Sequence, residues 1–176
     1  MNIRPAVPAD AEAIGHIRVN AWRAAYGGHM PTEYLASLDP QANLAGLREA
    51  LASPKPPFVL AVAECDQKLV GFSISGSPRY EAARDTLELW ALNVDPRYWR
   101  KGVGKRLVQE MLHSASAAKA SCVELWCLHG NLAAMALYES CGFVRTGAER
   151  TTTALTGMPL NEVAYAQALS PIHRAE

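Results

Sequence analysis

The residues best suited to chemistry lie between Asp95 and Leu107, where an apolar run ends and a long helical pattern begins. Gly102 and Gly104 would let the backbone turn sharply and let a ligand approach closely. The first amides of a helix lack partners within the helix and carry partial positive charge, so they can bind a pyrophosphate. Basic side chains surround this point: Arg97, Arg100, Lys101, Lys105 and Arg106. The same pattern also fits a glycine turn followed by a solvated basic helix start.

Two other glycine-rich phosphate motifs are excluded by single positions. A Walker P-loop that ends at Gly104-Lys105 requires glycine at position 99 and serine or threonine at position 106, where the chain has Trp99 and Arg106. A dinucleotide-binding fingerprint that begins at Gly102 requires a small residue at position 107, which is leucine. The segment therefore belongs to neither class.

Two blocks of sequence together resemble GNAT acetyltransferases. The first, VDPRYWRKGVGKRLVQEML, is similar to the pattern Gln/Arg-x-x-Gly-x-Gly/Ala, with Gly102 and Gly104 at the small positions. Trp99 stands where glutamine or arginine is usual, and Arg100 takes a place often held by glycine. The second, GNLAAMALYESCGF, is similar to the element Asn-x-x-Ala-x-x-x-Tyr-x-x-x-Gly-Phe. The segments IRPAVPADAEAI, WRAAYGG and GMPLNEVAYA also resemble bacterial members, so the likeness covers nearly the whole chain.

The resemblance implies the GNAT fold, an α/β (α+β) architecture. Its sheet would be mixed but mostly antiparallel, with about seven strands, helices on both faces and a central V-shaped splay. The resemblance also implies acetyl-coenzyme A as co-substrate and direct attack by a primary amine, without an acyl-enzyme. The residues expected to bind the coenzyme are Leu92, Asn93, Val94, Trp99, Arg100, Lys101, Gly102, Val103, Gly104, Lys105 and Asn131.

Amine acetylation requires a neutral amine, stabilisation of an oxyanion and a proton for the departing thiolate. The resemblance assigns the oxyanion to main-chain groups of Leu92 to Val94. Tyr138 is the expected acid, because it lies seven residues after Asn131, near the same helix face, and a phenol with a pKa of about 10 stays protonated at neutral pH. The alternative is that Tyr138 only packs.

Glu88 is the expected general base. It lies among apolar residues of the run Thr86 to Val94, where a half-buried carboxylate would have a raised pKa. It also matches a position at which many relatives keep an acidic group. The alternative is a strand-end glutamate paired with a lysine or an arginine. Glu162 is the second candidate, and water could relay the proton from either. Trp22, Tyr26 and Glu162 are expected at the acceptor site, although the aromatic residues could equally be packing residues.

The rest of the sequence predicts the elements that position these residues. In the run Thr86 to Val94, apolar residues occupy both odd and even positions, which is typical of a central strand that is covered on both faces. Other strands are expected over residues 2–4, 58–65, 69–76, 122–128, 143–153 and 162–169. Helices are expected from Pro8 to Gly27, from Pro31, over Gln41 to Ala52, over Gly102 to Ala120 and over Asn131 to Cys141.

The 176 residues predict one domain, residues 1–176. The 17 basic residues balance the 17 acidic residues, which argues against nucleic acid or an anionic membrane as the main partner. The opening residues lack the layout of a signal peptide, and the longest apolar run, Phe58 to Ala63, is too short to span a bilayer; a cytoplasmic location is therefore expected. Four scattered cysteines predict reduced core residues, and no residues at ligand spacing suggest a metal.

Three functions are compatible with these observations. The leading one is an N-acetyltransferase that acts on a small-molecule or peptide amine. The second is a non-catalytic, coenzyme-binding regulatory module, and the third is an acyltransferase with a longer donor, such as succinyl- or propionyl-coenzyme A. The sequence leaves the acceptor open among polyamines, amino acids, aminoglycosides and protein amino termini. It also leaves open a homodimer, because closing strands in this superfamily often pair across dimers.

Overall fold

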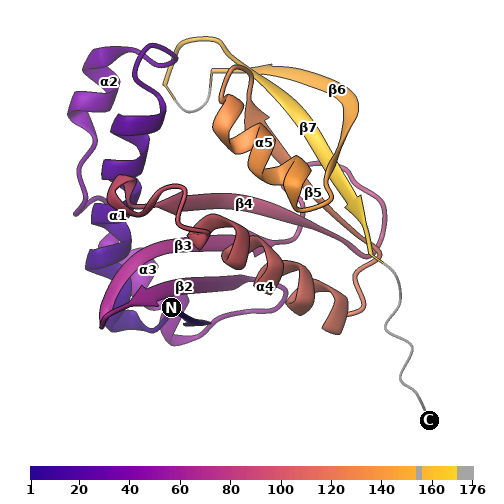
Figure 1. Cartoon of the computed structure of the whole chain (residues 1–176), viewed down its shortest axis with the longest axis horizontal. Helices are drawn as coiled ribbons and strands as arrows, with labels where there is room; N and C mark the ends of the chain where they lie inside the picture. Colours follow the sequence, from indigo (N-terminus) through magenta and orange to yellow (C-terminus); the bar gives the residue numbers. More distant parts are fainter. Residues whose placement is uncertain (154–155, 170–176) are drawn as a thin grey trace.

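The computed structural model of the chain describes residues 1–153 and 156–169. Its seven strands form one sheet in the order β1-β2-β3-β4-β5-β7-β6, as Figure 1 shows. The strands are β1 (Asn2–Pro5), β2 (Val59–Cys65), β3 (Lys68–Gly76), β4 (Thr86–Val94), β5 (Cys122–Leu128), β6 (Val144–Thr152) and β7 (Leu160–Ala168). The helices are α1 (Ala11–Ala25), α2 (Thr32–Ser37), α3 (Leu44–Ala52), α4 (Val103–Ala117) and α5 (Leu132–Ser140). Two short 3-10 turns, η1 (Pro8–Asp10) and η2 (Pro96–Tyr98), precede α1 and α4.

The sheet opens between two of its middle strands. Neighbouring strands are antiparallel except β4 and β5, which run parallel and pair only at Thr86–Glu88 with Cys122–Glu124. Beyond these three pairs, β4 continues beside β3 and β5 continues beside β7, so that the two strands diverge (Figure 1). The V-shaped splay implied by the resemblance is therefore present.

Helices cover both faces of the sheet, and each face has its own apolar core. The core beneath α4 and α5 includes Leu89, Val108, Met111, Val123, Leu125 and Phe143. The core beneath α1 and α3 includes Ile14, Ile17, Leu51, Leu60, Val62 and Phe72. On β4, Leu89 packs into the first core and Ala91 against the second. This arrangement confirms the prediction that β4 is a central strand covered on both faces.

Local backbone conformation explains where the elements differ from expectation. The helix expected from Gln41 begins only at Leu44, because Asn43 has a φ of 59°. The helix expected to reach Ala120 ends at Ala117, and Lys119 has a φ of 62° soon after it. The last hairpin is irregular, since the register of β6 against β7 shifts between Arg145 and Glu149.

The cysteines lie in the described part of the chain, and all four are free thiols. Cys127 is buried as expected, whereas Cys65, Cys122 and Cys141 are only half-buried, so the prediction of four core cysteines was correct for one. Among residues 1–153 and 156–169, no helix is long and apolar enough to cross a bilayer. No group of three or more potential metal ligands occurs in the same residues.

Candidate active site

The turn that follows β4 is held by a short hydrogen-bonded motif. The Asp95 carboxylate accepts hydrogen bonds from the main-chain amide of Arg97, at 3.0 Å, and from its guanidinium, at 3.0 and 2.8 Å. The Arg97 guanidinium holds the pKa of the Asp95 carboxyl below its usual range. Pro96 follows Asp95 and favours the first turn of η2, as it does at helix starts. The chain therefore leaves β4 in a fixed direction.

Trp99 ties the same turn back to the end of β4. Its indole Nε1–H donates a 2.7 Å hydrogen bond to the main-chain carbonyl of Val94, although 40% of Trp99 is exposed. In the family that the sequence resembles, a glutamine or an arginine is usual at this position, which is Trp99 in this chain. One main-chain group that was expected to contact the coenzyme, the Val94 carbonyl, therefore already has a protein partner.

The glycine turn has the backbone conformation that the sequence predicts. Arg100 has a φ of 58° and Gly102 a φ of 81°, both in the left-handed region. A Cβ atom on Gly102 would meet nothing within 4 Å, so its surroundings are open. A Cβ atom on Gly104 would lie 2.9 Å from Leu137 Cδ2, so a side chain there would collide with α5. The first intrahelical acceptor is the Gly102 carbonyl, which leaves the earliest amides of α4 free for a ligand.

Positive charge gathers at this helix start. Arg97 is committed to Asp95, but no ion pair to the other basic residues of the turn is found within the described residues. These residues are Arg100, Lys101, Lys105 and Arg106. Lys101 instead places its Nζ 5.0 Å from the centre of the Tyr98 ring. Free amides, an open glycine turn and unpaired cations together fit the pyrophosphate of a coenzyme.

Tyr138 lies on α5 and faces the sheet. Its ring centroid is 6.0 Å from that of Phe143 and 6.3 Å from that of Tyr165, and the residue is 8% exposed. Burial raises the pKa of the Tyr138 phenol, so it stays protonated at neutral pH. None of the described residues hydrogen bonds to the Tyr138 hydroxyl. The hydroxyl oxygen is not fully enclosed, so it can meet solvent or a ligand. Tyr138 thus packs as the alternative expected, and it also keeps an available proton.

Asn131 caps α5 rather than lying on its face. Its side-chain oxygen accepts a 3.2 Å hydrogen bond from the amide of Ala134, and the helix begins one residue later. Tyr26 lies near both Asn131 and Tyr138. It contacts the Asn131 side chain and is close enough to Tyr138 to interact with it electrostatically. Burial raises the pKa of Tyr26 to about 12. The structure therefore brings three of the expected site residues together at the end of β5.

The other expected acceptor residues lie beside this group. Trp22 contacts Tyr26 edge-to-face, with ring centroids 5.5 Å apart. Both pack against a small apolar cluster formed by Met30, Leu35, Leu128 and Leu160. Glu162, on β7 opposite Leu128, forms a 2.6 Å ion pair with Arg150 of β6. The aromatic residues are thus packed, and Glu162 already has a cationic partner.

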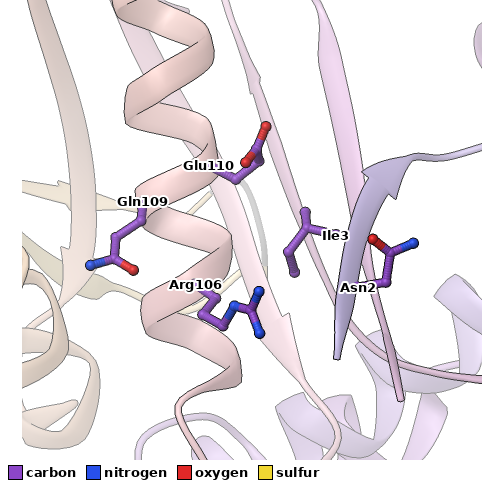
Figure 2. A pocket seen from close by; sticks show the side chains of 5 residues that line it. All are labelled: Asn2, Ile3, Arg106, Gln109 and Glu110. Carbon is purple, nitrogen blue, oxygen red and sulfur yellow. The ribbon is translucent and has the colours of Figure 1, made fainter. Parts of the chain in front are cut away.

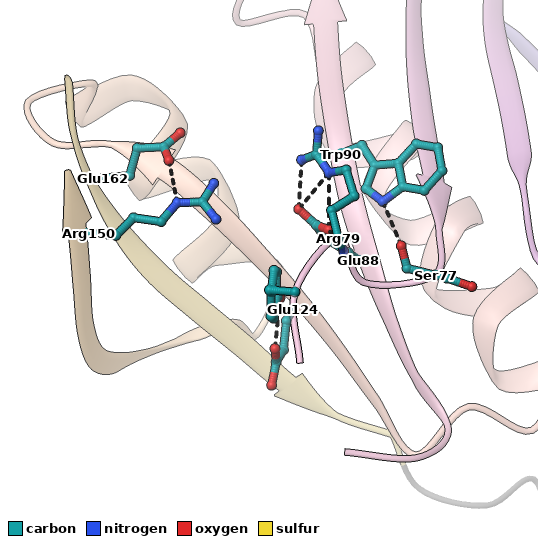
Figure 3. A network of polar contacts seen from close by, with 8 residues as sticks. Ser77, Arg79, Glu88, Trp90, Glu124, Arg150 and Glu162 are labelled. Carbon is teal, nitrogen blue, oxygen red and sulfur yellow. Dashed lines mark hydrogen bonds and ion pairs between the residues drawn. The ribbon is translucent and has the colours of Figure 1, made fainter. Parts of the chain in front are cut away.

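Glu88 is separate from that group and lies at the vertex of the splay. It is 1% exposed, which is more buried than the half-buried carboxylate expected from the sequence. Its oxygens accept hydrogen bonds from the Arg79 main-chain amide at 2.8 Å and from the Arg79 guanidinium at 2.7 Å (Figure 3). The arginine pair considered as the alternative for Glu88 is therefore present. For Glu88 to take a proton from an amine, this pair would have to open.

Sequence reasoning missed Glu124 and its partner. Glu124 pairs in register with Glu88, at the last rung before β4 and β5 diverge, and accepts a 2.8 Å hydrogen bond from the hydroxyl of Tyr80. Tyr80 lies in the β3–β4 connection, which has no apolar period and therefore gave no signal. A carboxylate inside the apolar run of β5 was the available signal, and it is the same signal that identified Glu88.

Two surface pockets lie away from these groups. The first, with a volume of about 300 Å³, lies between β1 and α4 and is lined by Asn2, Ile3, Arg106, Gln109 and Glu110 (Figure 2). The second, between α1 and α2, includes Arg23 and Leu35 in its lining. None of the residues expected to be catalytic or to bind the coenzyme or acceptor lines either pocket.

Comparison with known proteins agrees with this geometry. A family model described as the acetyltransferase (GNAT) family matches residues 11–143. The N-alpha-acetyltransferase RimI of Mycobacterium tuberculosis is 35% identical over 123 residues, which are 68% of this chain and 71% of that protein.

Two solved structures are similar in fold. The PaiA N-acetyltransferase of Thermoplasma acidophilum, in complex with coenzyme A, is 19% identical, with a TM-score of 0.75 over 96% of this chain and 98% of that one. The ribosomal-protein-alanine N-acetyltransferase of Brucella melitensis is 24% identical, with a TM-score of 0.74 over 96% of this chain and 100% of that one. The family model, the sequence relative and the shared fold lead to one conclusion: the chain belongs to the GNAT acetyltransferase family.

Proposed function

We propose that this chain, acting as one domain, transfers the acetyl group of acetyl-coenzyme A to a primary amine by direct attack of that amine. The observation that carries the proposal is the junction of β4 and α4. There, an open glycine turn, free helix amides and unpaired cations lie at the end of the strand that has separated from β5. The PaiA N-acetyltransferase of Thermoplasma acidophilum, in complex with coenzyme A, has the same fold.

The separated part of β4 supports a site for the coenzyme arm. Beyond Glu88, one edge of β4 faces the splay instead of a neighbouring strand, while the other edge stays paired with β3. Main-chain groups of Leu92 and Asn93 on such an edge can bind an extended amide-containing arm as they would bind a strand. The same groups can stabilise negative charge that develops on the acetyl oxygen. Asn131, which caps the start of α5 after β5, is the proposed contact for this arm from the β5 side of the splay.

Tyr138 is the proposed acid. Its hydroxyl has no protein partner among the described residues, and its raised pKa keeps it protonated at neutral pH. Tyr138 would give this proton to the sulfur as the carbon–sulfur bond breaks and take one from the attacking nitrogen, so that no free phenolate has to form. Three of the four cysteines are poorly suited to covalent catalysis: burial raises the pKa of Cys127 to about 12 and also raises the pKa of Cys122 and Cys141. These shifts favour direct transfer over an acyl-enzyme.

The α-amino group of a peptide is the acceptor that the comparisons favour. The relative with 35% identity is named an N-alpha-acetyltransferase, and a structural neighbour is named for the alanine of a ribosomal protein. Trp22, Tyr26 and Glu162 are the proposed acceptor-side residues, since they lie together beyond the end of β5. A small amine is the second candidate.

The test is release of free thiol from acetyl-coenzyme A with a set of amines. We expect turnover with at least one member of a set that contains an alanine-initiated hexapeptide, propylamine, spermidine and kanamycin, with the acetylated product identified by mass spectrometry. Binding of the coenzyme without turnover of any amine would favour the regulatory module. Faster turnover with succinyl- or propionyl-coenzyme A would assign the longer donor instead.

A further inference from the structure

Glu124 has an unusual state for a carboxylate inside a sheet. Its Oε2 accepts the hydrogen bond of Tyr80, whereas its Oε1 has no partner among residues 1–153 and 156–169. Oε1 is not fully enclosed by the protein, so it reaches solvent. No ion pair within the described residues involves Glu124. This half-buried carboxylate therefore has one neutral donor and one free oxygen at the vertex of the splay.

The neighbouring carboxylates differ from Glu124 in being neutralised. Figure 3 draws Glu124 between the Arg79–Glu88 pair and the Arg150–Glu162 pair. Three carboxylates and two guanidinium groups leave one net negative charge among these five side chains, and it resides on Glu124. The two arginines are at the solvent side, with 56% of the Arg79 side chain and 36% of the Arg150 side chain exposed.

The hydrogen-bond donor of Glu124, Tyr80, packs against an aromatic ring. The Trp126 ring lies two residues further along β5, in edge contact with Tyr80 at 6.0 Å between centroids. The Arg150 guanidinium lies 4.2 Å from the same Trp126 centroid. Burial, followed by the hydrogen bond to Glu124, raises the pKa of Tyr80, so that its hydroxyl remains a donor. Glu124 is thus held in place, with its charge stabilised from one side only.

On the basis of the proposed function, we propose that Glu124 binds the ammonium group of the acceptor and takes its proton. The site would therefore select amines that carry a single positive charge, at the reacting nitrogen. One ammonium balances the net charge of the five groups. A second cation on the acceptor would approach Arg79 and Arg150 at the rim, where like charge disfavours it. Because Glu88 is already saturated by Arg79, it does not compete for the ammonium.

The proton balance follows from this placement. The acceptor arrives as an ammonium ion, and Glu124 Oε1 takes one proton, directly or through water, and later releases it to solvent. The neutral nitrogen forms a bond to the acetyl carbon while the bond from that carbon to sulfur breaks. Tyr138 gives its proton to the sulfur and regains one from the nitrogen, directly or through water. The products are the acetylated amine, the free thiol and one proton in solution.

The kinetic test compares Glu124→Gln with Glu110→Gln, a matched change on the exposed face of α4. We expect Glu124→Gln to lower kcat/KM for the amine by about 100-fold, the range for loss of a general base, with the dissociation constant of acetyl-coenzyme A within twofold of wild type. Glu110→Gln should match wild type. An unchanged kcat/KM in Glu124→Gln would overturn the proposal.

The pH profile separates a proton acceptor from a packing residue. Tyr80→Phe removes a donor that stabilises the charged carboxylate, so the acidic limb of kcat/KM should move to higher pH. The titratable or charged groups around Glu124 are Tyr80, Glu88 with Arg79, Glu162 with Arg150, and Cys122 of the same strand. If the acidic limb stays in place in Tyr80→Phe, Glu124 is not the group that the profile reports.

Charge selection is tested with propylamine and 1,3-diaminopropane, which differ by one amino group. We expect wild type to prefer propylamine by at least about 10-fold in kcat/KM; equal values or the reverse preference would contradict the proposed selection. An acceptor-independent measurement is the carboxyl-carbon NMR signal of Glu124 in glutamate-labelled, coenzyme-saturated protein, assigned with Glu124→Gln. Ethylamine should shift this signal saturably and leave that of Glu88 in place. A silent Glu124 would overturn the inference, whereas failure of a folded protein to bind the coenzyme would overturn the proposed function itself.

Discussion

Replacing Glu88 by glutamine separates a structural role of this carboxylate from a catalytic one. Glu88 is 1% exposed and receives the Arg79 amide at 2.8 Å, its Nη2 at 2.7 Å and its Nε at 3.2 Å. Glutamine has nearly the same shape, but its NH₂ group would place a donor against the donors of Arg79. The substitution therefore removes the charge and at least one of these hydrogen bonds without leaving a cavity.

The expected loss of stability follows from the burial of the two partners. Breaking a buried ion pair by removing one charge typically costs about 3–5 kcal/mol, because the other charge is left uncompensated. Here 56% of the Arg79 side chain is exposed, so water can solvate the guanidinium again. We therefore expect a decrease of about 2–3 kcal/mol in the free energy of unfolding. For a chain of this size, that decrease lowers Tm by about 5–10 °C.

Urea denaturation and steady-state kinetics on the same variant decide between the two roles. The midpoint should fall while the slope of the free energy against urea stays unchanged. At a temperature where the variant is folded, kcat should lie within about threefold of wild type, since Glu88 is not the proton acceptor in this account. Glu149→Gln, at an exposed surface pair, is the control and should change the stability by less than about 0.5 kcal/mol. An unchanged midpoint with a 100-fold lower kcat would instead assign the base to Glu88 and remove its structural role.

Three further substitutions test other parts of the site and fold. Tyr138→Phe should lower kcat by about 100-fold and leave the dissociation constant of acetyl-coenzyme A unchanged, because the acid acts only as the thiolate departs; unchanged kcat would remove its role. Trp99→Phe removes the hydrogen bond to the Val94 carbonyl, worth about 1 kcal/mol, and should weaken coenzyme binding by about fivefold in calorimetry. Asp10→Asn tests pH dependence: Arg4 lowers the pKa of the Asp10 carboxyl in the folded protein. The ionised Asp10 therefore stabilises the wild type above the usual carboxyl pKa, and this contribution is lost as the pH falls through the lowered pKa. The variant should lose less stability over the same acid range. Equal losses of unfolding free energy in the two proteins would contradict this expectation.

The sequence was sufficient for the elements whose periodicity is undisturbed. β4 and β5 have the expected bounds, since each is a mostly apolar run, although each contains a glutamate. The start of α4 was predictable because Gly102 accepts the left-handed conformation that stops the preceding turn. The strands expected over residues 58–65 and 69–76 are also present as a hairpin, and Asp66 and Gln67 between them have positive φ. These features depend on neighbours in the chain, so local pattern specifies them.

The contacts that complete the site could not be read from local pattern. Arg79 and Tyr80 lie in a connection without periodicity, and they reach Glu88 and Glu124 only once β4 and β5 have paired. The Trp99 bond to Val94 likewise depends on how the η2 turn folds back. Sequence reasoning therefore identified a carboxylate in β4 but could not tell that a neighbouring arginine neutralises it.

Calorimetric titration with acetyl-coenzyme A, on wild type and on Gly104→Trp, tests whether the coenzyme binds at the junction of β4 and α4. Even a Cβ atom at position 104 lies 2.9 Å from Leu137, so an indole there would obstruct the helix start while circular dichroism reports whether the variant is folded. Charge reversal at exposed Lys101 (Lys101→Glu) provides a second variant, which removes the contact of this side chain with the Tyr98 ring but leaves the buried core intact. We expect saturable binding to wild type that is tighter than for adenosine diphosphate, and loss of binding in both variants. Undiminished binding by the folded variants would contradict the placement of the coenzyme at the junction of β4 and α4.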